Sequence, residues 1–222
     1  MAGVIPLGDA SRRPRAAAAV TLLLIAINAW VFFQELAYGD RFVRAWSVIP
    51  YRVTHGHHSV TLLTSMFMHA SWMHIIGNMV FLWAFGPAME DAMGHLRYLI
   101  FYLAGGIVAM CAQVLADPYS HIPTLGASGA IAAVMGAFIV TYPRDRIRTL
   151  LFVFIFIRIA FIPAVLLIGF WILLQVLNLG VVAQAHTGGV AYLAHIGGFL
   201  FGVVLGRLFV NEKRLAFRQF YG

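Results

Sequence analysis

The sequence predicts an all-α polytopic membrane protein, built as a bundle of six transmembrane helices. Hydrophobic residues make up 62% of its 222 residues and charged residues only 10%, with a mean hydropathy of +0.87. A soluble domain carries roughly 25% charged residues, so most of the outer surface of this chain must face lipid. Six apolar stretches are each long enough, at about 20 residues, to cross a bilayer as a helix.

We interpret all six stretches as helices, because open sheets leave backbone groups unsatisfied in lipid. They lie near residues 17–37, 73–93, 97–116, 126–142, 160–180 and 189–210. The first follows a basic segment around Arg12 and Arg13 and is too long for a signal peptide, which predicts an uncleaved first span. The expected organisation is a cytoplasmic segment 1–16, a six-helix intramembrane domain 17–210 and a cytoplasmic tail 211–222.

The distribution of positive charge orients the predicted bundle. With the N-terminus inside, most Lys and Arg residues fall on the inner side, and only Arg41, Arg44 and Arg52 fall on the outer side. This bias places both termini in the cytoplasm. The net charge of +7 therefore has a topological interpretation, and no basic face with interleaved aromatic residues predicts a nucleic-acid partner. The apolar segment 149–161, which contains Arg158, is expected to lie along the inner interface without crossing.

Polar residues near the outer ends of three predicted spans define the candidate site. Ser128 lies near the start of the fourth span, His195 about two turns into the sixth, and His74 and Asn78 near the start of the second. Since the even-numbered spans all run from outside to inside, these four residues fall at one shallow depth. Polar residues inside spans are functional candidates by default, and a serine with a histidine base forms a catalytic pair.

Two stripes of small residues, spaced by four, favour a close crossing of the fourth and sixth spans. The stripes are Ser128, Ala132 and Gly136 on one span and Ala194, Gly198, Gly202 and Gly206 on the other. Small residues let membrane helices approach closely. Such a crossing would bring the serine oxygen to ~3 Å from a histidine nitrogen, the reach of a general base. Helix packing alone explains the glycines but leaves a buried hydroxyl and imidazole unexplained.

An acyl-transfer enzyme also needs hydrogen-bond donors for the oxyanion. The N–H of Ser128, at the start of a helix, and the side chains of His74 and Asn78 can donate. No carboxylate among the 8 acidic residues is available as a third member, since Glu90 and Asp91 lie at the inner end of the second span and Asp117 lies in a loop. This predicts a Ser–His dyad whose imidazole is oriented by packing rather than by an aspartate. Neither the single cysteine, Cys111, nor the loop histidines form a ligand set, so no metal and no cofactor are expected.

The segment 180–189, just before the sixth span, contains several glycines and His186. Glycine hinges beside an active site are typical of a mobile cap that admits substrate and water, and an ordinary connector explains the segment equally well. His186 is the main rival to His195 as the base. We prefer His195 because a helix fixes the direction of its side chain.

Four motifs in order resemble those of the rhomboid intramembrane serine proteases, over residues 62–206. They are Gly126-Ala127-Ser128-Gly129, Ala194-His195 followed by Gly198 and Gly202, His74-Ile75-Ile76-Gly77-Asn78, and Gly86 with Glu90 and Gly94. The resemblance implies Ser128 as nucleophile, His195 as base, and an oxyanion hole formed by His74, Asn78 and the Ser128 N–H. It also implies a structural role for His69.

The chain departs from this family pattern at two places. Many rhomboids carry an aromatic residue one turn after the serine, stacked on the catalytic histidine, where this chain has Ala132. The imidazole is then held by another aromatic residue or held less firmly. The Trp-Arg pair common in the first outer loop is also missing, with Arg44-Ala45-Trp46 as the nearest approach.

The expected function is that of a rhomboid-type serine endopeptidase, which cleaves transmembrane segments of membrane-protein substrates near the outer face of the bilayer. A bacterial plasma membrane is expected, because no Ser/Arg-rich transit segment precedes the first span. One alternative is an inactive rhomboid-like protein that binds membrane clients without cleavage, which loss of Ser128 or His195 would have favoured. Another is a small transporter, which would require paired charges or broken helices at mid-membrane.

Overall fold

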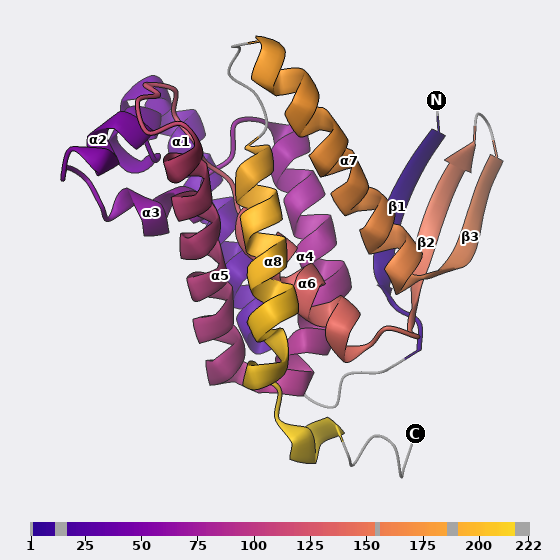
Figure 1. The fold of residues 1–222 in the computed structure, drawn as a ribbon. Coiled ribbons are helices and arrows are strands. Elements are labelled where there is room, and N and C mark those ends of the chain that lie inside the picture. Colours follow the sequence, from indigo (N-terminus) through magenta and orange to yellow (C-terminus); the bar gives the residue numbers. More distant parts are fainter. Residues whose placement is uncertain (1, 12–16, 154–155, 186–190, 216–222) are drawn as a thin grey trace.

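Six long helices form a bundle in the computed structural model of the protein (Figure 1). The structure describes residues 2–11, 17–153, 156–185 and 191–215. The long helices are α1 (Ala19–Trp46), α4 (Trp72–Met93), α5 (His95–Ala116), α6 (Ser128–Thr141), α7 (Ala164–Ala185) and α8 (Tyr192–Phe209). Between α1 and α4 lie the short helices α2 (Pro50–Thr54) and α3 (Thr61–Thr64) and the 3₁₀ turn η1 (Ser65–Phe67).

Each apolar stretch predicted from the sequence coincides with one of the long helices. Among the described residues, α1, α5 and α8 are long and apolar enough to cross a membrane, while α6 and the stretch Ala164–Leu179 of α7 are apolar but shorter. Helix α4 is as long as α5 but carries polar side chains, His74 and Asn78 among them. The protein is therefore a mostly helical, multi-pass membrane protein, and the crossing of all six helices stays a prediction.

The expectation of an all-α chain is wrong in one part, because the structure also contains an antiparallel sheet. Its strands are β1 (Ala2–Asp9), β2 (Arg146–Val153) and β3 (Phe156–Pro163), in the order β1-β2-β3. The segment expected at the inner interface is rich in β-branched and aromatic residues, which favour strands. The N-terminal segment supplies the third strand, and the sheet stands beside α7 in Figure 1.

Helix α6 forms the centre of the bundle. All its residues from Gly129 to Phe138 are buried, and it packs against α4, α5 and α8. Most of these residues are alanine, glycine or other small apolar residues, which let the neighbouring helices come close on several sides. The start of α6, with Ser128, is thereby held inside the bundle.

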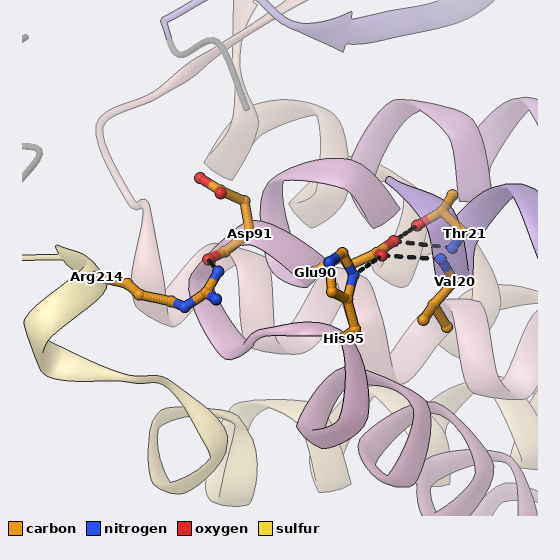
Figure 2. Close-up of polar contacts among 6 residues, drawn as sticks. All are labelled: Val20, Thr21, Glu90, Asp91, His95 and Arg214. Atoms are coloured by element: carbon orange, nitrogen blue, oxygen red, sulfur yellow. Dashed lines mark hydrogen bonds and ion pairs between the residues drawn. The ribbon is translucent and has the colours of Figure 1, made fainter. Parts of the chain in front are cut away.

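At the end of the bundle opposite to Ser128, the buried carboxylate of Glu90, near the end of α4, links α4 to α1 and α5 (Figure 2). One oxygen accepts a hydrogen bond from the Val20 N–H at 2.8 Å, and the other accepts from the N–H and hydroxyl of Thr21 at 2.8 and 2.7 Å. The Nδ1 atom of His95, in the first turn of α5, lies 2.6 Å from the same carboxylate. Glu90 therefore caps the first turn of α1, which has no side-chain cap of its own, and ties it to α4 and α5.

We predict that Glu90→Ala lowers the free energy of unfolding by about 2–4 kcal/mol, because it leaves the Val20 and Thr21 N–H groups buried without an acceptor. Denaturant-induced unfolding in detergent micelles would measure this change. The matched control is Glu212→Ala, which removes an exposed carboxylate 3.4 Å from Arg207 and should change stability little. Equal effects of the two substitutions would contradict the capping role.

Candidate functional site

A sharp turn at Gly126 places Ser128 at the first residue of α6. Gly126 has φ +137°, a conformation that side chains rarely adopt, and its N–H donates to the Ser65 carbonyl oxygen at 2.9 Å. A Cβ at this position would also lie 3.0 Å from two ring atoms of His74. Glycine is therefore required here both for the turn and for the close approach of the His74 ring to the start of α6.

Glycines on α8 bring that helix into backbone contact with α6. A Cβ on Gly198 would collide with the Gly129 carbonyl oxygen, and one on Gly202 would collide with the Ala133 carbonyl oxygen. The predicted close crossing of these two helices is thus present. On α6 the contacting residues are Gly129, Ala133 and Ala137, each one position after a residue of the predicted stripe. Gly136, which belongs to that stripe, also contacts α8.

The crossing brings Ser128 and His195 together. The Ser128 Oγ atom lies 2.6 Å from His195 Nε2, within hydrogen-bond reach. His195 lies in the first turn of α8 and is only 6% exposed. A serine hydroxyl paired in this way with a buried imidazole has the geometry of a nucleophile with its general base.

Two side chains of α7, which sequence reasoning missed, hold the other side of the His195 ring. Its Nδ1 atom lies 2.7 Å from Gln175 Oε1, and its ring lies 5.4 Å from the ring of Trp171, centroid to centroid. Tyr192 makes an edge contact at 6.4 Å. The sequence predicts that packing rather than an aspartate orients the imidazole, and to this packing the structure adds a hydrogen bond from the ring to an amide.

His195 receives aromatic contacts from Trp171 on α7 and Tyr192 on α8, and not from position 132 on α6. Ala132 is fully buried in α6, and the rings nearest His195 are Trp171 and Tyr192. Trp171 and Gln175 are four residues apart in the sequence, hence on one helix face. A polar residue in an otherwise apolar span was the signal that could have identified Gln175.

His74 and Asn78 lie on α4, facing the same space. The Ala70 N–H donates to His74 Nδ1 at 3.4 Å, which leaves the proton of a neutral His74 on Nε2, the ring atom nearer to Gly126. Asn78 is 8% exposed, and its side-chain nitrogen has no hydrogen-bond partner among the described residues. Both side chains can therefore donate a hydrogen bond to a group bound beside Ser128.

Ser128 and His195 both line two cavities. The smaller, of about 240 Å³, is also lined by Asn78 and by apolar side chains that include Phe81 and Trp171. The other, of about 830 Å³, is lined by the same pair and by loop residues around Pro123. His74 lines both cavities. The four predicted site residues thus all line the smaller cavity.

His69 supports the position of His74. Its ring is buried and contacts the His74 ring edge-on at 5.0 Å, while its N–H donates to the buried Glu35 carboxylate at 2.9 Å. Burial, with a contribution from neighbouring His74, lowers the pKa of His69 to about 3, so the ring is neutral. This arrangement accords with a structural role for His69.

The segment interpreted as either a cap or a connector lies only partly within the structure. Helix α7 extends to Ala185, so Gly180 belongs to a helix. His186, Gly188 and Gly189 lie outside the described residues. The segment predicted to form the first outer loop, roughly residues 38–60, is largely helical, since α1 continues to Trp46 after a kink at Gly39 and α2 follows.

Residues 56–212 match the family model for the rhomboid domain, which covers more than half of the chain. The chain belongs to the rhomboid family. Both members of the Ser128–His195 pair lie within the matched region, as do His74 and Asn78. This rhomboid therefore carries its candidate site inside the family's own domain.

Named rhomboid proteins in bacteria and mitochondria are similar to this rhomboid. It is 40% identical over 78 residues to Rhomboid protease GluP of Bacillus subtilis, over 35% of this chain and 15% of that protein. It is 30% identical over 136 residues to Rhomboid protein 1, mitochondrial, of Saccharomyces cerevisiae, over 59% of this chain and 38% of that protein. It is 33% identical over 90 residues to human Presenilin-associated rhomboid-like protein, mitochondrial, over 39% of this chain and 23% of that protein. The matches span less than two thirds of each of these relatives.

We predict that Gly202→Ala lowers the free energy of unfolding by about 1–3 kcal/mol, because its Cβ would collide with backbone atoms of α6. Gly169→Ala on α7 is the matched control. A Cβ there meets no atom within 4 Å, and the change should leave stability unchanged or raise it by about 0.5–1 kcal/mol. Denaturant titration of both variants in detergent is the measurement. A tolerated Gly202→Ala would contradict the backbone contact.

Proposed function

We propose that this rhomboid is an intramembrane serine endopeptidase with a Ser128–His195 dyad. The proposal rests on the 2.6 Å distance between Ser128 Oγ and His195 Nε2, in a pair that lines two cavities. Family membership adds support, since relatives named as proteases share the domain.

The proposed reaction is acyl transfer to serine followed by hydrolysis. His195 Nε2 takes the proton from Ser128 Oγ, which attacks the carbonyl carbon of the scissile peptide bond. The negative charge on the carbonyl oxygen is stabilised by the Ser128 N–H, the Asn78 amide and His74 Nε2–H. The C–N bond then breaks as His195 gives its proton to the leaving amine. Water, activated by the same imidazole, hydrolyses the ester and restores Ser128.

The substrates we propose are transmembrane segments of other membrane proteins, cleaved near the outer face of the bilayer. In this proposal all six long helices cross the membrane, both termini are cytoplasmic, and the membrane is a bacterial plasma membrane. The smaller cavity is lined by Phe81 on α4 and by Trp171 on α7, whose rings lie 6.5 Å apart. A substrate segment that enters laterally between these helices and unwinds locally would present its peptide bond to Ser128.

We predict that a fluorophosphonate probe labels the detergent-solubilised protein, and that Ser128→Ala and His195→Ala each reduce the labelling rate by at least about 1,000-fold. The reason is that the probe reacts only with a serine whose proton has been accepted by a base. Ser59→Ala, which removes an exposed loop serine, is the matched control and should label as the parent does. A folded parent that stays unlabelled would instead favour a protein that binds membrane clients without cleaving them.

We predict that Asn78→Ala lowers kcat for a transmembrane substrate in lipid vesicles by about 100-fold with little change in KM. The lost amide donates only when charge develops on the carbonyl oxygen. Asn178→Ala, an exposed amide on α7, is the control and should retain the parent kcat. An Asn78→Ala variant with raised KM and unchanged kcat would assign Asn78 to substrate binding instead.

A further inference from the structure

Helix α7 buries the polar side chain of Gln175 among residues that are mostly apolar and exposed. Gln175 is only 8% exposed, whereas the neighbouring Leu174, Val176 and Leu177 are all exposed. A buried amide costs free energy unless both its donor and its acceptor are satisfied. The partners of Gln175 therefore indicate what the side chain does.

Both ends of the Gln175 amide are bonded, and the pattern fixes which atom faces His195. The Nε2 group donates to the Trp171 carbonyl oxygen at 3.1 Å, and only the nitrogen end of an amide can make that bond. The oxygen end is thereby directed at His195 Nδ1, at 2.7 Å. The Trp171 carbonyl oxygen, and not His195, therefore determines which end of the amide is the nitrogen.

The Gln175 oxygen determines the tautomer of the His195 ring. An amide oxygen can only accept, so Nδ1 must carry the ring proton. His195 Nε2 then has its lone pair free toward Ser128 Oγ, 2.6 Å away, which is the form that can accept the serine proton. With the other tautomer, Nε2–H would point at the hydroxyl and the ring could not act as a base.

Aromatic contacts restrict the same ring. Trp171 lies at 5.4 Å with its plane tilted by 41°, and Tyr192 lies edge-on at 6.4 Å. Within the described part of the chain, His74 is a further titratable ring that lines the same cavity as His195. The group that accepts from His195 Nδ1 is a neutral amide, which adds no negative charge beside the imidazole, whereas a carboxylate would add one.

We propose that Gln175 is a positioning residue for the dyad, which holds His195 in the tautomer and orientation that can accept the Ser128 proton. The inference rests on the proposed protease function. Since Gln175 lies on α7 and His195 on α8, the bond also makes the competence of the dyad depend on the position of α7. Any outward displacement of α7 that lengthens the bond would release the imidazole.

The test compares Gln175→Leu, which keeps the approximate volume but removes the acceptor, with Gln175→Glu, which keeps an acceptor and adds a charge. Asn178→Leu, which removes an exposed amide from the same helix, is the control. The readout is the rate of fluorophosphonate labelling of purified protein across pH, with unfolding measured in parallel. We expect Gln175→Leu to label about 10- to 100-fold more slowly than the parent at equal stability, with Asn178→Leu unchanged.

The conservative variant separates positioning from packing. Gln175→Glu should label faster than Gln175→Leu, and its rate should rise at higher pH than that of the parent, because a carboxylate stabilises the charged imidazolium. Labelling of Gln175→Leu within twofold of the parent would overturn the inference. So would equally slow labelling of both variants with an unshifted pH profile, which marks a packing role. A parent that does not label refutes the proposed function itself.

A measurement on the unmodified protein does not depend on whether the Gln175 variants fold. Nitrogen NMR of protein with ¹⁵N-labelled histidine, with His195→Ala used to assign the signal, reports which ring nitrogen carries the proton. We expect a protonated Nδ1 and an unprotonated Nε2. The reverse tautomer in the folded parent would overturn the role of Gln175.

Discussion

The backbone contact between α6 and α8 is the constraint on which the rest of the structure depends. Gly198 and Gly202 face backbone atoms of α6, so no side chain separates the two helices. Packing drives the association of membrane helices, and small residues allow the closest packing. The same contact sets the distance between Ser128, at the start of α6, and His195, in the first turn of α8. Wider helix spacing would separate the hydroxyl from the imidazole even if both residues were kept.

Hydrogen bonding divides the polar groups of the site into two sets. The first set is paired: His195 is bonded at both ring nitrogens, and His74 Nδ1 accepts a hydrogen bond from the Ala70 N–H. The Asn78 amide nitrogen, in contrast, has no partner within the described part of the chain. An unpaired donor is costly in a nonpolar environment. The proposed reaction explains this cost, because an oxyanion forming on the substrate would be its partner.

The helices and the Ser128–His195 pair could be predicted from the sequence because polar residues stand out in apolar stretches and the small-residue spacing indicates which helices approach. The pairing of β1 with β2 could not be predicted, because the two segments lie far apart in the sequence and no local pattern indicates such a contact. Gln175 was missed because the third member of the site was sought among carboxylates. An amide on an apolar span belongs to no motif, and only the fold shows that it reaches His195.

An experimental structure of the protein after reaction with a small fluorophosphonate would show directly whether Ser128 is the activated nucleophile. We expect a phosphorus atom bonded to Ser128 Oγ. The phosphoryl oxygen should accept hydrogen bonds from the Ser128 N–H, the Asn78 amide and His74 Nε2, with Gln175 still bonded to His195. An unmodified Ser128, or an adduct whose oxygen points away from Asn78 and His74, would contradict this expectation.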